Sequence, residues 1–237
     1  MPIRTEQIEQ IGVITLDRPD RAHAYDRAHL DALEDAIGLL SGSARAIVVC
    51  STGKRAFCAG ADLNELRQAD PIDALDLRSQ RVFTILARSP AISIAAVQGP
   101  AVAGGCELAL ACDIRVVGPY ARFSLPETAL GIIPSAGGCT RLTRLIGPSR
   151  AKMVILAGVA IDAQRAVDWG LAMEIAPDPL ARALSLAAEI GLRDPVALRL
   201  ARQIIDRGED QGSLEAERVS EALLYTRKAA RDRAKQG

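Results

Sequence analysis

The chain has 237 residues, and its 29 basic and 29 acidic side chains give a formal net charge of zero. A hydrophobic fraction of 49% excludes a disordered chain, and the balanced charge lacks the basic excess that is typical of nucleic-acid-binding proteins. The five cysteines are odd in number and contain no CxxC pair, so we expect reduced thiols in a cytoplasmic protein rather than a disulfide framework.

Short apolar runs alternate with helical patterns along most of the chain. Apolar, β-branched runs predict strands at residues 11–16, 46–50 and 92–97, with weaker candidates at 114–117 and 171–175. Apolar residues recur with helical spacing at 27–40 and 72–87. This alternation predicts an α/β fold in which helices cover both faces of the sheet.

The segment 91–112 is long enough to cross a bilayer and carries Glu107 as its single charged residue. Turn residues at 98–100 and the pair Gly104 and Gly105 interrupt it, so we expect a buried strand, a turn and a buried helix instead. The first ten residues lack the basic-then-apolar layout of a signal peptide. These features predict a soluble protein with no membrane partner.

After about residue 178 the strand pattern ends. Helical patterns follow at 180–192, 195–206 and 214–227, which predicts an α/β core over 1–178 and a helical region over 179–237. The last residues, 229–237, are polar, and we expect them to be frayed or to form a short exposed helix.

Several common catalytic and binding motifs are missing from the sequence. The two histidines, His23 and His29, have no metal-ligand spacing to a cysteine or a carboxylate, and a surface or packing role is expected for both. Ser135 has Ile133 where a nucleophile elbow requires glycine. There is no Walker A sequence and no GxGxxG at the start of a helix, so a nucleotide-phosphate site is not supported.

Two glycine-bearing turns follow apolar strands, at residues 56–63 (AFCAGADL) and 99–107 (GPAVAGGCE). Small residues allow a ligand to approach the backbone, and two N–H groups that converge on one oxygen would form an oxyanion hole. Taken by their spacing alone, both segments are better explained as simple turns.

Two acidic residues lie beside these turns. Glu107 is in the first turn of an otherwise apolar helix, and Glu127 follows Pro126 in FSLPET. Each carboxylate by itself is explained as a helix cap. Two acids beside two glycine turns, in apolar surroundings, favour general acid/base chemistry.

The segments AFCAGADL, GPAVAGGCELALACDIRV and FSLPETALGIIPSAGG, in this order and spacing, resemble the enoyl-CoA hydratase/isomerase (crotonase) family. The resemblance runs from about Gly12 through Leu171 and more loosely to the end of the chain. It implies a spiral of repeated ββα units, a helical region that builds a homotrimer or a dimer of trimers, and acyl-CoA thioesters as substrates. It implies no separate cofactor, since coenzyme A is part of the substrate, and no metal.

Position by position, the resemblance assigns oxyanion N–H groups to Ala61 and Gly104 and the catalytic acids to Glu107 and Glu127. Glu107 corresponds to the base that activates water, and Glu127 to the donor that protonates C2. Around the adenine and phosphates of the coenzyme, the substrate-binding positions it implies are Arg21, Ala22, Ala24 and Ala59. The substrate-contacting run is Ala61, Asp62, Leu63 and Asn64, and the remaining substrate-binding positions are Gly104 and Ser135.

The sequence departs from the family pattern at two of these places. His23 stands where many members have asparagine, and Ser135 replaces a common glycine near the water site. Enoyl-CoA hydration is the function that this pattern favours. A Δ3,Δ2-enoyl-CoA isomerase, another acyl-CoA reaction of the family, and a non-catalytic or RNA-binding homologue remain as alternatives. Interleaved acidic and basic residues in the tail favour a solvated, salt-bridged surface over an RNA site.

Overall fold

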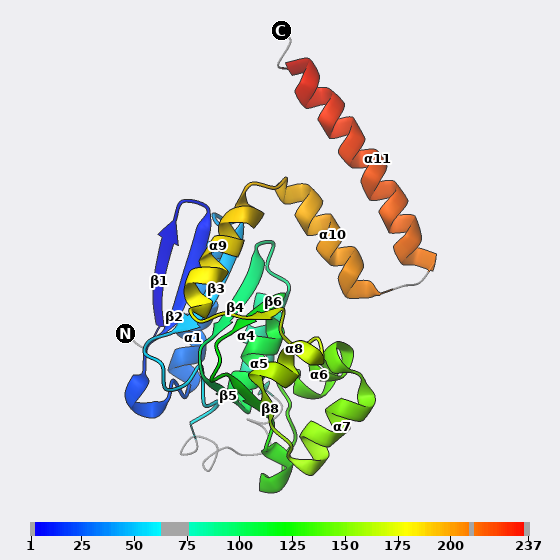
Figure 1. The fold of residues 1–237 in the computed structure, drawn as a ribbon. Helices are drawn as coiled ribbons and strands as arrows, with labels where there is room; N and C mark the ends of the chain where they lie inside the picture. The colour runs from blue at the N-terminus through cyan, green and yellow to red at the C-terminus, as the bar shows by residue number, and fades with distance from the viewer. Residues whose placement is uncertain (1–2, 63–75, 209–210, 235–237) are drawn as a thin grey trace. The chain divides into compact units, whose positions relative to one another are not determined.

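The computed structural model describes residues 3–62, 76–208 and 211–234 and contains a large, mainly parallel sheet (Figure 1). Its strand order is β1-β2-β3-β4-β6-β9, and every neighbouring pair is parallel except β1 with β2. The strands are β1 (Ile3–Ile8), β2 (Ile11–Leu16), β3 (Ala46–Ser51), β4 (Ile92–Val97), β6 (Ile114–Val117) and β9 (Glu174–Ile175). All residues of β3 and β4 are buried, as expected for central strands of a parallel sheet.

A second, smaller sheet joins β5 (Pro100–Val102), β7 (Arg122–Ser124) and β8 (Ile161–Asp162). Isolated bridges extend this ladder, pairing Cys58 with Ala101 and Tyr25 with Ala61. The chain therefore passes repeatedly from a strand of the large sheet to a segment of the small ladder and then into a helix. This is the repeated ββα arrangement that the sequence resemblance implies.

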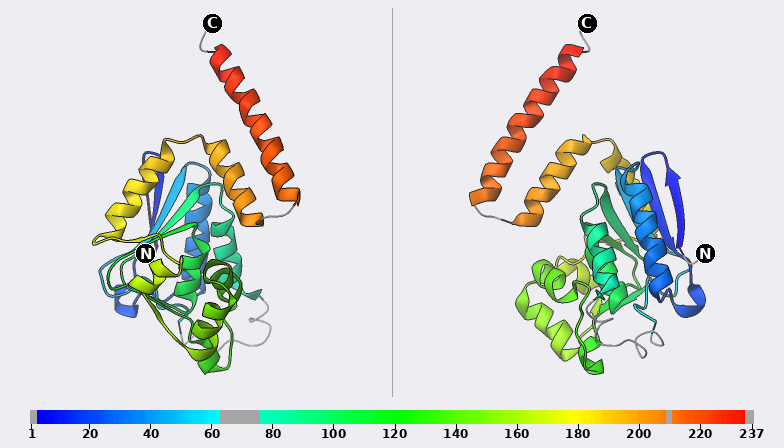
Figure 2. Two further views of the ribbon diagram at one scale, coloured as in Figure 1. Left: turned by 45° about the vertical axis from the view of Figure 1, so that its right-hand side comes forward. Right: turned by 180° about the vertical axis from the view of Figure 1, so that it is seen from behind.

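Helices cover both faces of the large sheet (Figure 2). Helices α1 (Arg27–Ser41) and α4 (Arg78–Ala87) pack against each other on one face, and α9 (Pro179–Gly191) contacts β3 and β4 from the other. Asp26 begins α1 by accepting a hydrogen bond from His29 N, and Leu33 and Ile37 are among its buried apolar residues. The remaining helical segments are η1 (Pro19–Arg21), α5 (Gly104–Ala111), η2 (Glu127–Leu130), α6 (Gly138–Ile146), α7 (Pro148–Ala157) and α8 (Ala163–Asp168).

The compact α/β unit ends at Gly191, and residues 192–237 form a second unit. The predicted boundary lies at residue 178, whereas α9 packs on the sheet through buried Ala183 and Ala187 and belongs to this compact unit. The second unit contains α10 (Pro195–Arg207) and α11 (Gln211–Ala234), which contact each other. Helix α11 is longer than the predicted helix over 214–227 and includes residues 229–234 in its backbone.

Most predicted elements are confirmed, and the exceptions are short or polar. Strand β1 has no counterpart among the predicted strands, because five of its six residues are exposed at the sheet edge and show no apolar alternation. The strand predicted over 171–175 is confined to Glu174–Ile175. The predicted helix over 72–87 begins at Arg78 among the described residues, and 72–75 lie outside them.

The segment 91–112 forms β4, β5 and α5, as expected. Within the described part of the chain, no helix combines the length and apolar character needed to cross a membrane. All five cysteines are free thiols, and Cys50, Cys58, Cys106 and Cys112 are buried.

Candidate active site

A cavity of about 560 Å³ opens where the carboxyl ends of the central strands meet the small ladder. It brings together most of the site residues that the sequence analysis named. From that set, its walls contain Arg21, Ala24, Ala59, Ala61, Asp62, Gly104, Glu107, Glu127 and Ser135. Leu63 and Asn64 lie outside the described residues, so their predicted contacts with substrate stay predictions.

The two candidate oxyanion donors lie on adjacent segments of the cavity wall. A Cβ on Gly60 would lie 3.0 Å from the backbone nitrogen of Gly104, so the segment ending in Ala61 contacts the N-terminus of α5. Among the described residues, neither Ala61 N–H nor Gly104 N–H donates a backbone hydrogen bond. Gly104 is the first residue of α5, where the helix leaves the N–H without an internal partner. Two such donors can bind one developing oxyanion.

The turn before α5 has an unusual backbone. Ala103 has φ of 50° and ψ of −126°, a conformation that a residue with a Cβ rarely adopts. Its N–H donates to Ser124 O at 2.9 Å, which ties this turn to β7. Backbone strain of this kind persists where the surrounding structure enforces it, and it is common at functional sites.

Glu107 lies in α5 with 4% of its surface exposed. Its Oε1 accepts hydrogen bonds from Ala136 N at 2.7 Å and Gly138 N at 2.8 Å. Since Gly138 is the first residue of α6, Glu107 caps α6 rather than its own helix. No described residue hydrogen-bonds to its Oε2, and Glu107 lines the cavity. Burial raises the pKa of Glu107, and the two N–H donors and the Arg141 guanidinium oppose that rise.

Glu127 begins η2 and is 6% exposed. Its buried Oε2 has no hydrogen-bond partner among the described residues. Burial raises the pKa of Glu127 to about 7, and the negative charge of Glu107 contributes to the rise. Near neutral pH Glu127 can therefore hold a proton, while the N–H donors stabilise the ionised form of Glu107. Two carboxyl groups held in different environments are suited to separate acid and base roles.

The raised pKa of Glu127 has a consequence for stability. The pKa of Glu127 is near 4.5 in the unfolded chain and about 7 in the folded chain, so the folded chain binds this proton more tightly. The resulting stabilisation of the fold is complete at low pH and is lost as pH rises through about 7. We expect Glu127→Gln to be more stable than the wild type by about 2–3 kcal/mol at about pH 8, and to differ little at about pH 4. Denaturant unfolding at both pH values measures this. Glu6→Gln, on exposed β1, is the matched control, and equal pH dependence in wild type and Glu127→Gln would contradict the expectation.

The residues predicted to surround the coenzyme lie in the segment 18–25 and at Ala59, and a backbone hydrogen bond joins the two. Ala59 N donates to Ala22 O at 3.0 Å, so Ala22 supports this wall although it does not line the cavity itself. His23 is buried, and its Nδ1 accepts from Arg18 N while its Nε2 donates to Thr52 O. His23 therefore has the expected packing role, since both ring nitrogens are used within the fold.

Asp62 and His29 each interact with an oppositely charged or hydrogen-bonding side chain nearby. The Asp62 carboxylate pairs with the Arg18 guanidinium at 3.3 Å on the cavity wall. His29 Nδ1 is 2.6 Å from Asp26 Oδ1 in the first turn of α1, which is a local packing arrangement. Within the described residues, no group of three or more His, Cys, Asp or Glu side chains is placed to bind a metal ion.

Sequence reasoning missed Tyr25, whose side chain lines the cavity beside Gly104. A Cβ on Gly104 would lie 1.8 Å from Tyr25 Oη, so the tyrosine fills the space that glycine leaves. Its ring packs edge-on against Phe83, with ring centroids 5.8 Å apart. Burial raises the pKa of Tyr25 well above its usual value, so the phenol remains protonated. Nothing in the segment RPDRAHAYD indicates that its one aromatic residue, Tyr25, lies beside Gly104.

The rest of the cavity wall is mainly apolar and was not predicted either. Leu130, Ile132 and Ile133 line it and are each between 47% and 64% exposed. They line the same cavity as Glu107 and Glu127, so an apolar group bound here would lie near the two carboxyl groups. An apolar wall beside a few polar groups is typical of a small-molecule site.

The sequence model of the enoyl-CoA hydratase/isomerase family matches residues 6–237. The chain is 38% identical over 225 residues to 2,3-dehydroadipyl-CoA hydratase of Escherichia coli, covering 94% of this chain and 88% of that protein. It is 35% identical over 209 residues to short-chain-enoyl-CoA hydratase of Clostridium acetobutylicum, covering 86% and 80%. The crystal structure of an enoyl-CoA hydratase from Bacillus anthracis superposes with a TM-score of 0.89 at 32% identity, covering 94% and 90%. With the fold and the cavity described above, these matches show that the chain belongs to the enoyl-CoA hydratase/isomerase family.

Proposed function

We propose that the protein adds water across the double bond of 2-enoyl-CoA thioesters. The observation that carries this proposal is the single cavity onto which Glu107, Glu127 and the segments of Ala61 and Gly104 all open. The relatives named 2,3-dehydroadipyl-CoA hydratase and short-chain-enoyl-CoA hydratase support the same reaction class here.

In this proposal the Ala61 and Gly104 N–H groups bind the thioester oxygen. Attack of water at C3 moves negative charge onto that oxygen, and fixed donors stabilise the charge where it develops. Losing one such donor typically raises the barrier by about 3–4 kcal/mol. The partial positive charge at the start of α5 acts in the same direction.

The two glutamates then divide the proton transfers. Glu107 Oε2 accepts a proton from water while the water oxygen bonds to C3, and protonated Glu127 gives its proton to C2. Glu107 then releases a proton to solvent and Glu127 takes one up, which returns both groups to their starting states. The raised pKa of Glu127 supports the donor role, and the N–H bonds on Glu107 Oε1 support the base role.

A spectrophotometric assay tests this function. Loss of the enoyl-thioester absorbance is measured with crotonyl-CoA and with longer and aromatic 2-enoyl-CoAs, because the apolar wall at 130–133 sets the acyl preference in this proposal. We expect hydration of at least one of these substrates. Hydration of none, together with conversion of a 3-enoyl-CoA, would favour the isomerase reaction instead.

We further propose a homotrimer or a dimer of trimers. In the second unit, Leu214, Val219 and Leu223 of α11 are 49–59% exposed, and an assembled state would cover them. Light scattering should give at least three times the chain mass of 25.1 kDa. A particle of one chain mass would contradict the assembly.

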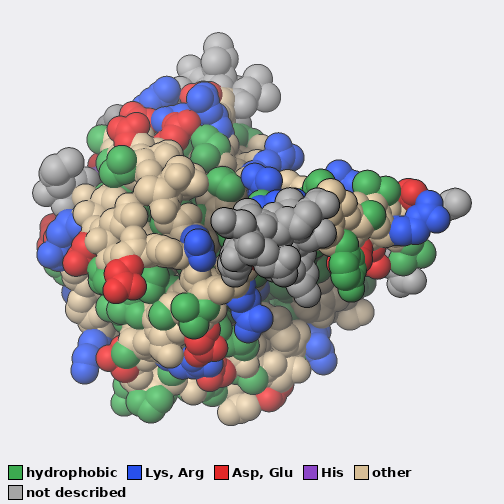
Figure 3. Space-filling model, turned by 90° about the horizontal axis from the view of Figure 1, so that it is seen from above, with side chains coloured by type: hydrophobic (Ala, Val, Ile, Leu, Met, Phe, Trp, Pro, Cys, Tyr) green, Lys and Arg blue, Asp and Glu red, His purple; other side chains and the backbone are tan. Residues whose placement is uncertain are grey.

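The proposed partner is the acyl-CoA substrate alone, with no separate cofactor, in a cytoplasmic protein. The surface supports a small-molecule partner over RNA, since Figure 3 shows basic and acidic side chains intermixed on the face in view. Described basic residues of the tail also pair with acids, as in Arg218–Glu215 at 2.7 Å and Arg227–Asp194 at 3.2 Å. A steep salt dependence with tight RNA binding would overturn this part of the proposal.

A further inference from the structure

The loop at 134–138 (PSAGG) carries the N–H groups that bind Glu107, and after Pro134 it contains only small side chains. Its carbonyl groups are held from outside the loop. Gln80 Nε2 donates to Ser135 O at 2.6 Å, and Arg141 Nη1 donates to Ala136 O at 2.7 Å. The Ser135 carbonyl and the Ala136 N–H belong to one planar peptide unit, so the bond from Gln80 orients the N–H that Glu107 receives.

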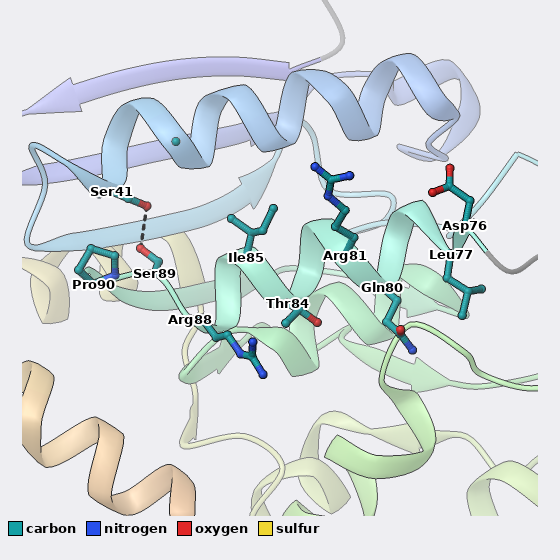
Figure 4. A pocket seen from close by; sticks show the side chains of 11 residues that line it. Ser41, Asp76, Leu77, Gln80, Arg81, Thr84, Ile85, Arg88, Ser89 and Pro90 are labelled. Atoms are coloured by element: carbon teal, nitrogen blue, oxygen red, sulfur yellow. Dashed lines mark hydrogen bonds between the residues drawn. The ribbon is translucent and has the colours of Figure 1, made fainter.

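Both outside contacts lead back to α4. Gln80 and Thr84 are one turn apart on α4, and Figure 4 shows them directed away from α1, on the side opposite Arg81 and Ile85. Thr84 Oγ1 accepts from Arg141 Nη2 at 3.3 Å. The Arg141 guanidinium thus links the loop to α4 through Thr84, and the Gln80 amide forms a second link one turn earlier on α4.

Glycine at two loop positions makes room for this arrangement. A Cβ on Gly137, where φ is +107°, would lie 2.1 Å from Arg141 Nη1. A Cβ on Gly138 would lie 3.0 Å from Glu107 Oε1. The glycines therefore let the guanidinium and the carboxylate approach the loop backbone from two directions.

We propose that Gln80 and Arg141 are positioning residues for Glu107, which tie the loop to α4 so that Ala136 N–H and Gly138 N–H both bind Oε1. This proposal rests on the proposed function in taking Glu107 as the base. Neither side chain touches the reacting atoms. Gln80 acts through the loop, Arg141 acts through the loop and through its charge, and Oε2 remains available to water.

The arrangement also determines how readily Glu107 loses its proton. Both N–H donors and the nearby positive charge of Arg141 favour the carboxylate, against the effect of burial. If the loop shifts, Glu107 loses the N–H donors that oppose the effect of burial, and its pKa rises. A smaller fraction of Glu107 is then ionised at neutral pH. Because the Gln80 side chain is neutral, a shift of this titration in a Gln80 variant reports the position of the loop, whereas Arg141 also acts through its charge.

The test is a titration of the Glu107 carboxyl carbon by NMR on the full chain without substrate, with the signal assigned by its loss in Glu107→Gln. We expect Arg141→Gln to raise the midpoint by about one pH unit or more, and Gln80→Leu to raise it by less. Arg141→Lys keeps the charge and should fall between wild type and Arg141→Gln. Arg144→Gln, which removes an exposed charge from the same helix, is the matched control.

In hydration assays, the acid limb of kcat/KM, which reports the free enzyme, should move to higher pH by the same amount in each variant, with KM at the pH optimum changed less than about twofold. An unchanged titration midpoint in Gln80→Leu would overturn the proposal, because a shift in Arg141→Gln alone follows from the loss of its charge. If Arg141→Gln does not fold, Gln80→Leu decides it. Absence of hydration in the wild type would instead refute the proposed function, whereas the substrate-free titration would still report on the positioning of Glu107.

Discussion

Replacing Glu107 or Glu127 by glutamine should slow hydration by about 10²–10⁴-fold while acyl-CoA binding changes little. In Glu107→Gln the side-chain carbonyl can still accept from Ala136 N and Gly138 N, so the loop keeps its place, but the amide cannot take a proton from water. In Glu127→Gln the amide has no acidic proton for C2. Single-turnover kinetics and equilibrium binding of a saturated acyl-CoA separate the two effects.

Glu6→Gln, which changes an exposed carboxyl on β1, controls for the loss of one negative charge. It should keep the wild-type rate. A folded Glu107→Gln or Glu127→Gln protein with nearly the wild-type turnover would show that the residue is only a cap or a buried packing group.

Adding one methyl group at Gly104 should reduce turnover by about 10²–10³-fold, the usual effect of disabling an oxyanion donor. The sequence alone suggested that a side chain here would block approach of the thioester to the backbone. The structure provides a more specific reason: the new Cβ would lie 1.8 Å from Tyr25 Oη and 2.8 Å from Cζ, so either the ring or the start of α5 must move. Measuring kcat and thermal unfolding of Gly104→Ala together tests this.

Gly38→Ala is the matched control, because a Cβ on this glycine of α1 has no atom within 4 Å. It should leave the rate unchanged and stabilise the helix slightly. In a Tyr25→Leu background, which removes the contacting ring atoms, Gly104→Ala should lose less activity than in the wild type. Equal losses in both backgrounds would show that Tyr25 is not the obstacle.

The sequence predicted the central strands well and the peripheral ones poorly, for a physical reason. Strands β3 and β4 are buried on both faces, so burial requires the apolar runs that make them visible. Strand β1 is mostly exposed, and β8 has two residues, so neither needs an apolar pattern. The predicted boundary falls before α9 because it was placed where the strand pattern ends, and α9 is a helix that packs on the sheet.

The candidate site was predicted from motifs, but the environment of its carboxyl groups was not. Nothing in the order of residues shows that Glu107 caps α6, or that the Oε2 of Glu127 is buried without a partner among the described residues. Tyr25 and Arg141 are likewise distant in sequence from the site groups they serve, Gly104 and Glu107. Such contacts arise from packing between ββα units, which spacing within one segment does not specify.

The mass of the product formed from a 2-enoyl-CoA tests the central claim most directly. After incubation with the wild-type protein and, in parallel, with Glu107→Gln, the thioester is analysed by mass spectrometry. Hydration predicts a wild-type product heavier than the substrate by one water molecule, and almost none of it with the variant. A product of unchanged mass, or equal conversion by both proteins, would contradict hydration by the Glu107 and Glu127 pair.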